Sequence, residues 1–378
     1  MTEPLIPRPE QRPHITVDAA TPRERGEQRG RALADSVRGG IERYDKLFTA
    51  GGLDEATVRR DAETALDAIG EHLPAMLEEI EGIAAGSGTP LWRIGALNAR
   101  TEILARSTTV PPGECSTILR VPAADPSSDA APRHVTGIQT WDWHVELSSY
   151  WHTLEARGGT YDVVGVTEHG ILGKIGVNSA GLALHYNVLG HIADKAGGIP
   201  MHVLAFAVLS ETASVAEALQ LIRSVPIESS GSFSLFDATG DAVILDLSPV
   251  GVFEHRTDSG YLLRTNHFLA PELTPDEKTW NYQPGSGARF ALLTGRLSSL
   301  MTAGDMPEVS AGLLPCMATA SGEAPVTRLP DPAEPFGKRW ASLALVILDP
   351  ATREARVLDG TPVDAQTATP EQWRQLRA

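Results

Sequence analysis

The sequence predicts an α+β domain in which two mainly antiparallel sheets pack face to face and helices cover the outside. Helical periodicity fills about the first quarter of the chain, strand-like runs joined by tight turns follow, and a helical pair interrupts these strands near the middle. Strands that follow one another through hairpin turns form antiparallel sheets, and grouped helices cover their outer faces. No internal repeat or change of composition divides the 378 residues, so we expect a single domain over residues 1–378.

The helices are predicted from end signals and apolar spacing. Thr21 followed by Pro22 is typical of a helix start, and this helix is expected to end near Phe48. It carries Gly26 and Gly30 on one face, a pattern that allows close approach of a neighbouring backbone. Further helices are expected at about 54–88 with a break at Pro74, and at about 89–104, 201–209, 214–223 and 289–300.

The strands are predicted from branched, aliphatic and aromatic runs that are bounded by glycine and polar turns. They are expected at residues 14–17, 116–121, 135–143, 153–157, 161–167, 171–178, 182–188, 232–237, 241–247, 251–256, 261–265, 341–349 and 354–358. Residues 1–13 are expected to form a disordered lead, and the last dozen residues a mobile or loosely docked tail.

Composition excludes several classes of function. The formal net charge of −16 argues against nucleic acid or an anionic membrane as a partner. Two cysteines are too few for a disulfide framework, and neither a membrane-spanning run nor a targeting segment is recognised. The eleven histidines do not fall at metal-ligand spacing, and no phosphate-binding glycine loop is present. We therefore expect a cytoplasmic protein without a metal or a cofactor.

Cys115 is the main candidate for a catalytic residue. It follows a Pro-Pro-Gly turn and precedes the strand predicted at 116–121. A cysteine in such a place is most simply a small buried residue. The alternative is a nucleophile that becomes a new N-terminus when the chain cuts itself between Glu114 and Cys115. The freed α-amine, with a pKa of about 7.7–8.0, then serves as the base beside the thiol, so no histidine is needed.

Three polar residues at strand ends are candidates for the remaining roles. Asp142 stands among aromatic residues and is expected to hold the α-ammonium or a leaving amine. Asn266 is expected to donate a hydrogen bond to an oxyanion, and Arg339 to bind a carboxylate. Spacing alone leaves the simpler alternatives open, which are an ordinary strand-end aspartate, a turn asparagine and a solvated loop arginine.

These candidates lie within short stretches that resemble a known family. The stretches are Leu97-Asn98-Ala99-Arg100-Thr101-Glu102, Cys115-Ser116-Thr117, Gln139-Thr140-Trp141-Asp142, Gly173-Lys174-Ile175-Gly176-Val177-Asn178-Ser179-Ala180-Gly181, Tyr186-Asn187, Thr265-Asn266-His267 and Arg339-Trp340-Ala341-Ser342-Leu343. In this order and over nearly the whole chain, the sequence resembles the peptidase C45 family. These isopenicillin-N acyltransferase-like proteins belong to the N-terminal nucleophile hydrolase superfamily.

The resemblance implies a four-layer α-β-β-α fold and roles for the candidates. Cys115 would be both the processing and the catalytic nucleophile, Asn266 the oxyanion donor, and Asp142 and Arg339 active-site partners. Residues 1–114 are expected to form an α subunit and residues 115–378 a β subunit, which remain together as a heterodimer. The sequence departs from the best-known member before the cut, where Glu114 replaces a glycine.

The expected substrate is a small-molecule amide or acyl donor, and the substrate site is expected to include Trp141, Trp143, Tyr186, Ser230 and Ser232. For the tryptophans, a core stripe along a strand is the alternative. The leading hypothesis is an amide hydrolase that acts on a carbon–nitrogen bond through a thioester on the cysteine. An acyltransferase that moves an acyl group from coenzyme A or an amide to an amine, and an unprocessed binding protein, are the alternatives.

Overall fold

Two sheets form the centre of the molecule in the computed structural model, which describes residues 5–107, 109–110, 113–123, 133–278, 285–302 and 312–378. Within these ranges one sheet has eight strands and the other has six. Strands of the two sheets face each other, with β2 against β7, β12 against β6 and β13 against β5. The predicted pair of face-to-face sheets is therefore confirmed.

The eight-stranded sheet is antiparallel except at one edge. Its strands, in spatial order, are β1 (His14–Asp18), β4 (Trp151–Arg157), β5 (Val163–Glu168), β6 (Ile175–Asn178), β7 (Leu182–Val188), β8 (Gly231–Asp237), β9 (Ala242–Ser248) and β10 (Gly251–His255). Only the pair between β1 and β4 is parallel among the described pairs. The first strand of the chain thus joins a sheet whose other strands come much later.

The six-stranded sheet is antiparallel throughout its described pairs. Its spatial order is β11 (Gly260–Arg264), β2 (Cys115–Val121), β3 (Thr136–His144), β12 (Trp340–Asp349), β13 (Glu354–Leu358) and β14 (Trp373–Arg377). All nine residues of β3 are buried, because apolar layers lie on both sides of this sheet. The strand nevertheless carries polar residues between its apolar ones, in the sequence Thr-Gly-Ile-Gln-Thr-Trp-Asp-Trp-His.

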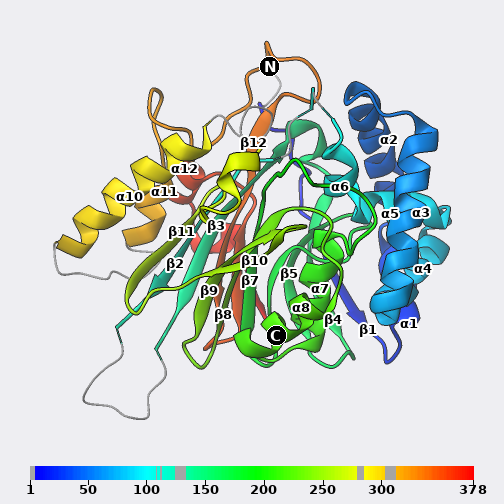
Figure 1. Cartoon of the computed structure of the whole chain (residues 1–378), viewed down its shortest axis with the longest axis horizontal. Coiled ribbons are helices and arrows are strands. Elements are labelled where there is room, and N and C mark those ends of the chain that lie inside the picture. Colours follow the sequence, from blue (N-terminus) through cyan, green and yellow to red (C-terminus); the bar gives the residue numbers. More distant parts are fainter. Residues whose placement is uncertain (1–4, 108, 111–112, 124–132, 279–284, 303–311) are drawn as a thin grey trace.

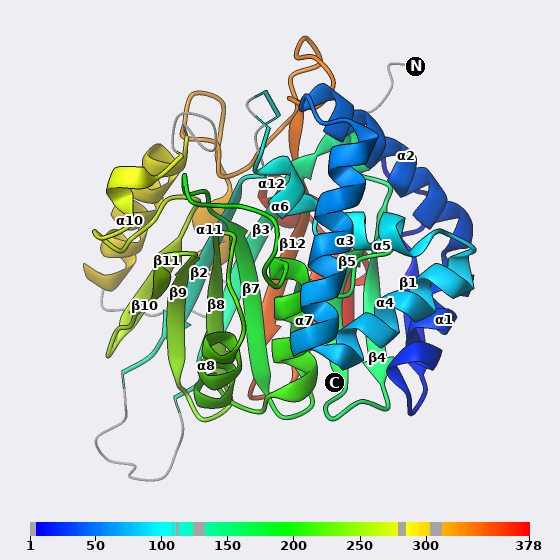
Figure 2. The same ribbon diagram turned by 45° about the vertical axis from the view of Figure 1, so that its right-hand side comes forward.

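Helices cover the outer face of each sheet. On the six-stranded sheet, α10 (Ser286–Thr302), α11 (Leu314–Met317) and α12 (Pro362–Ala365) share an apolar cluster with β2, β3 and β12. On the eight-stranded sheet, α7 (Met201–Glu211) packs against β6 and β7, and α8 (Val215–Ser224) packs against β8. These layers confirm the predicted α-β-β-α arrangement, which Figures 1 and 2 show from two directions.

The remaining helices form a separate group near the edge strand β1, at the side of the molecule opposite α10 (Figure 1). They are α1 (Pro22–Ala32), α2 (Ala34–Ala50), α3 (Glu55–His72), α4 (Pro74–Ser87), α5 (Leu91–Asn98) and α6 (Arg100–Leu104). The predicted capping by Thr21 is present, since its side chain accepts a hydrogen bond from the Glu24 backbone. No helix in the described ranges has the length and apolar character that crossing a bilayer requires.

Four sequence predictions need correction. The helix expected from residue 21 to about 48 is interrupted at Leu33, which divides it into α1 and α2. The helix expected at about 89–104 is divided at Ala99 into α5 and α6. The end of the chain is not a loose tail, because β14 pairs with β13 along its length. The lead before β1 is partly anchored, because the guanidinium of Arg12 stacks 3.9 Å from the ring of Trp151 and pairs with Asp359. These contacts join segments that lie far apart in the sequence, so no local pattern predicts them.

Glycines let α1 and α4 touch backbone to backbone. A Cβ atom added at Gly26 would lie 2.0 Å from the carbonyl oxygen of Glu79, and one at Gly30 would lie 2.4 Å from that of Ile83. Such distances are far inside van der Waals contact. The prediction of close packing on this face of the helix is confirmed.

We expect Gly26→Ala to lower the free energy of unfolding by about 3 kcal/mol or more, because the added methyl group forces the two helices apart. Chemical denaturation of a Cys115→Ala parent, which would prevent the expected self-cleavage, measures this change. Gly295→Ala in α10 is the matched control, because its Cβ would meet nothing within 4 Å, and it should gain up to about 1 kcal/mol. Equal effects of the two substitutions would contradict this account.

Candidate functional site

Cys115 is the first residue of β2 and lies directly opposite Trp141 on β3. It is 3% exposed. The antiparallel register therefore brings the residue before Cys115 next to the residue after Trp141. The strand was predicted to begin at residue 116, and in the structure it begins one residue earlier, at Cys115.

Both polar groups of the peptide bond between Glu114 and Cys115 are held by predicted site residues. The carbonyl oxygen of Glu114 accepts a hydrogen bond from the backbone N–H of Asp142 at 3.1 Å. The N–H of Cys115 donates to Oδ1 of Asn266 at 2.8 Å. The structure thus brings Cys115, Asp142 and Asn266 together around one peptide bond. The prolines of the turn before it, Pro111 and Pro112, lie outside the described residues.

Asp142 is fully buried beside the cysteine. Its Oδ1 accepts a hydrogen bond from Oγ of Ser342 at 2.6 Å, a residue that β12 places opposite it. Burial raises the pKa of the Asp142 carboxyl to about 7. Burial, and after it the charge of Asp142, raises the pKa of the Cys115 thiol to about 12. In the uncut chain the thiol is therefore protonated at neutral pH.

Asn266 is fixed from two sides. Its backbone N–H donates to Oγ of Ser286 at 2.8 Å, and its amide Nδ2 donates to the carbonyl of Val188 at 2.9 Å. In this uncut chain the side-chain oxygen thus contacts the nitrogen of Cys115, while the Glu114 carbonyl takes its hydrogen bond from Asp142. The predicted donation from Asn266 to an oxyanion stays a prediction for the cut protein.

Arg289 is a site residue that the sequence reasoning missed. It is fully buried near the start of α10. Its Nη1 donates to the carbonyl of Cys115 and to Oγ of Ser116, both at 2.9 Å, and its Nη2 donates to Oδ1 of Asn266 at 3.1 Å. One guanidinium thus orients the cysteine and the asparagine together. The sequence showed only a cation among small and apolar residues at a helix start, which is no specific motif.

Arg339 lies elsewhere. Its guanidinium pairs with Glu146 at 2.8 Å, and its carbonyl accepts a hydrogen bond from the N–H of Val145. Among the described residues it makes no ion pair or hydrogen bond with Cys115, Asp142 or Asn266. Its role as an active-site partner stays a prediction.

The two tryptophans of β3 lie in the core beside buried charges. Trp141 and Trp143 are at most 1% exposed. Nζ of Lys174 lies 4.5 Å from the ring centroid of Trp141, and the indole N–H of Trp143 donates to the hydroxyl of Tyr44 at 2.9 Å. Both residues therefore contact core groups in the uncut chain, and their contact with a substrate stays a prediction.

Lys174 is a second residue to which the sequence analysis gave no role. Its ammonium lies 3.2 Å from Oε1 of Glu168, and both side chains are only 3% exposed. Burial, together with the nearby guanidinium of Arg100, lowers the pKa of Lys174 to about 8. A buried amine with this pKa exchanges protons near neutral pH.

The other predicted substrate residues are also buried. Tyr186 is 1% exposed and packs edge-on against the ring of His202. Oγ of Ser230 donates to Asp194 at 2.6 Å, and Ser232 lies on β8 opposite Asn187 of β7. Their role in binding a substrate stays a prediction.

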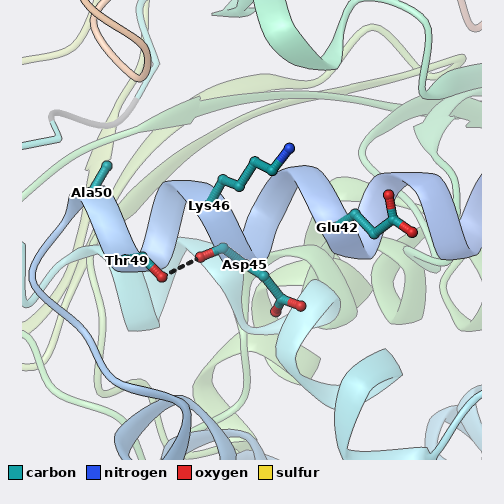
Figure 3. A pocket seen from close by; sticks show the side chains of 5 residues that line it. All are labelled: Glu42, Asp45, Lys46, Thr49 and Ala50. Carbon is teal, nitrogen blue, oxygen red and sulfur yellow. Dashed lines mark hydrogen bonds between the residues drawn. The ribbon is translucent and has the colours of Figure 1, made fainter.

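An open pocket is present on the outer side of α2, where Figure 3 shows its lining residues. These are Glu42, Asp45, Lys46, Thr49 and Ala50. The only bond drawn among them joins the Thr49 hydroxyl to the backbone carbonyl of Asp45. None of the predicted site residues lines this pocket. Within the described ranges, no three His, Cys, Asp or Glu side chains gather in a way that suits a metal ion.

Comparison with known proteins finds relatives that are acyltransferases. Residues 132–308 match the family model "Acyl-coenzyme A:6-aminopenicillanic acid acyl-transferase". The 40 kDa form of the acyl-coenzyme A:6-aminopenicillanic-acid acyltransferase of Emericella nidulans is 28% identical over 282 residues, which cover 71% of this chain and 74% of that protein. The predicted resemblance is confirmed, and it indicates an enzyme related to acyltransferases.

Solved structures give weaker similarities. Penicillin V acylase from Agrobacterium tumefaciens aligns with a TM-score of 0.40 and 14% identity, over 64% of this chain and 83% of that chain. A mutant form of conjugated bile acid hydrolase from Clostridium perfringens aligns with a TM-score of 0.44 and 11% identity, over 69% of this chain and 92% of that chain. At these TM-scores the two similarities add nothing to the fold that the sheets and helices themselves show.

The raised pKa of Asp142 makes a prediction about stability. Because the folded pKa of about 7 lies above the ordinary value of 3.8, the folded protein binds this proton more tightly than the unfolded chain. The contribution therefore favours folding at low pH and is lost as the pH rises from about 4 to about 7. In a Cys115→Ala background, Asp142→Asn should gain stability relative to its parent over this interval, by up to about 4 kcal/mol.

Denaturant titrations at several pH values measure this difference in the free energy of unfolding. Asparagine keeps an oxygen that accepts the hydrogen bond of Ser342, so the packing around position 142 is preserved. A difference that stays constant between pH 4 and pH 7 would show that the carboxyl has no raised pKa.

Proposed function

We propose that this relative of the acyl-coenzyme A:6-aminopenicillanic acid acyl-transferases is a self-processing amide hydrolase. It would cleave a small N-acyl or amide substrate through a thioester on Cys115. The observation that carries the proposal is the peptide bond at Glu114, whose carbonyl oxygen and following N–H are both held by hydrogen bonds to Asp142 and Asn266. A group that holds the carbonyl oxygen also stabilises the negative charge that develops on it during attack.

Self-cleavage begins with the thiol of Cys115. Its sulfur attacks the carbonyl carbon of Glu114, and the negative charge forms on the oxygen that accepts from the Asp142 N–H. The C–N bond then breaks, the thiol proton passes to the departing nitrogen, and Glu114 is left as a thioester on the sulfur. Water hydrolyses this thioester, which gives a carboxylate on Glu114, a free thiol and a free α-amine on Cys115.

The cut supplies the base for the second reaction. The α-amine of Cys115 takes the thiol proton as the sulfur attacks the substrate carbonyl, and gives it to the leaving amine. Asn266 already contacts this nitrogen, and Arg289 contacts both residues. Asp142 is proposed to hold the ammonium form of the new terminus. The amide Nδ2 of Asn266, which donates to the carbonyl of Val188 in the uncut chain, is proposed to donate to the oxyanion in the cut protein. Arg339 remains a candidate for binding a substrate carboxylate.

The two products of the cut are proposed to stay together as subunits of residues 1–114 and 115–378. Strand β1 belongs to the first and pairs with β4 of the second over five residue pairs. The fully buried Arg100 of the first pairs with Glu168 of the second. Separation would break backbone hydrogen bonds and leave buried charges unpaired, which is costly.

Transfer of the acyl group to an amine is the second candidate, because the matching family model describes acyl-transferases. Both activities use the same thioester and differ in what attacks it. A non-catalytic binding protein is the third, and the bulky Glu114 before the cut favours it.

We expect Cys115→Ala to give a folded, uncut and inactive chain, because no sulfur is left to attack the Glu114 carbonyl. The wild-type protein should show two fragments, which end at Glu114 and begin at Cys115. Mass spectrometry under denaturing conditions measures both results.

Cys316→Ala is the matched control. This cysteine lies in α11, outside the hydrogen bonds that surround Cys115, and is also buried, so its variant should be cut and active. Full activity in a chain that stays continuous through positions 114 and 115 would refute the mechanism. Loss of labelling by a thiol-reactive amide analogue in Cys316→Ala alone would show that Cys115 is not the nucleophile.

For the cut protein we expect the acyl group of a substrate to be released as a free acid. A panel of N-acyl amino acids, β-lactams and acyl amines, followed by mass spectrometry of the products, tests this. An added amine that takes up most of the acyl group would identify a transferase instead.

A further inference from the structure

The side chain of Glu114 occupies a site with two arginines. The residue is 5% exposed, and its Oε2 lies 3.5 Å from Nη1 of Arg328 and 3.8 Å from Nε of Arg289. Direct hydrogen bonds between guanidinium and carboxylate are shorter, at about 2.7–2.9 Å. The carboxylate is thus attracted by both cations but is not tightly bound to either.

The side chain of Arg289 and the backbone of Arg328 are held in place without help from Glu114. Arg289 donates to Cys115, Ser116 and Asn266 through its two terminal nitrogens. The backbone N–H of Arg328 donates to Oγ of Ser342, and the N–H of Ser342 donates to the carbonyl of Arg328, both at 2.9 Å. All these residues follow the proposed cut. The pair of cations therefore belongs entirely to the second fragment and persists when Glu114 leaves.

One of the two arginines is partly exposed to solvent. The side chain of Arg328 is 28% exposed, whereas that of Arg289 is fully buried. A ligand anion would meet a solvated guanidinium at the entrance and a desolvated one beside the cysteine. Desolvated ion pairs with good geometry are the ones that discriminate between charged and neutral ligands.

The position of Glu114 relative to the reacting bond indicates which part of a ligand would reach the arginines. In self-cleavage the thiol of Cys115 attacks the carbonyl of Glu114, and in the proposed function the same thiol attacks the acyl carbonyl of the substrate. The substrate carbonyl must therefore take the place of the Glu114 carbonyl. The carbon chain of the acyl group then follows the path of the Glu114 side chain.

We propose that Arg328, with Arg289, forms an anion site that Glu114 fills in the uncut chain and that a carboxylate on the acyl group of the substrate fills after the cut. This inference rests on the proposed function and names its substrate class, the monoamides of dicarboxylic acids. In a glutaryl group, the number of bonds between the acyl carbonyl carbon and the carboxylate carbon equals the number between the main-chain carbonyl carbon and the side-chain carboxylate carbon of a glutamate residue. A glutaryl amide is therefore the best match in length.

The kinetic test compares glutaryl-4-nitroanilide with pentanoyl-4-nitroanilide, which has the same chain length without the carboxylate. The cut wild-type protein should prefer the glutaryl compound in kcat/KM by about tenfold to a hundredfold, the range expected for a hydrogen bond to a charged group. Arg328→Gln should lose most of this preference through KM. Arg328→Lys should recover part of it, because lysine keeps the charge without the planar fork.

Arg256→Gln is the matched control, because this arginine pairs with the partly exposed carboxylates of Glu254 and Asp241 at the surface, and it should keep the wild-type preference. A cut enzyme that prefers the pentanoyl compound, or an unchanged preference in Arg328→Gln, overturns the anion site and leaves the proposed function standing.

A binding measurement tests the anion site even if no substrate is turned over or the chain stays uncut. Glu114→Gly removes the internal carboxylate in either state. Calorimetry should then show glutarate binding at least tenfold more tightly than pentanoate, and adding Arg328→Gln should abolish the difference. Equal binding of the two acids to Glu114→Gly overturns the inference. Absence of cleavage in the wild type, with selective glutarate binding, rejects the proposed function and retains the anion site.

Discussion

The pairing of β2 with β3 is the constraint on which the site depends. Because Cys115 faces Trp141, the N–H of Asp142 reaches the carbonyl of Glu114. A slip by one residue would turn every side chain of β2 to the opposite face of the sheet and break this contact. The register is secured on the inner face by a polar contact between sheets, where the hydroxyl of Thr117 donates to Asn187 at 2.7 Å. It is secured on the outer face by the apolar cluster under α10.

Charged groups of both signs lie close together in the buried site, and this arrangement suits the proposed self-cleavage. Arg289 and Lys174 oppose Asp142, yet burial outweighs their attraction for a thiolate, so the pKa of Cys115 stays high. A neutral thiol reacts poorly with external electrophiles, whereas the neighbouring carbonyl is held beside it permanently. The proposed cut would change this state, because a free α-amine would be a proton acceptor where the continuous chain has an amide.

Local patterns in the sequence were enough to predict the layers, most strands and three residues that meet at one peptide bond. Cys115, Asp142 and Asn266 stand at strand ends, where turn chemistry and polarity mark a position. Arg289 and Lys174 could not be assigned roles in this way, because a buried cation is recognised only by the partners that folding brings to it. Similarly, β14 was missed because its pairing partner, rather than its own short polar sequence, makes it a strand.

Strand β14 affects how readily this edge of the sheet can pair with another molecule. Without residues 373–377, β13 would present a row of unsatisfied amide and carbonyl groups at the rim of the six-stranded sheet, a template on which another chain can assemble. Strand β14 covers that row, and Arg374 and Arg377 on either side of the buried Leu376 place two cations along the new edge. Charged side chains on an edge strand disfavour pairing with another chain.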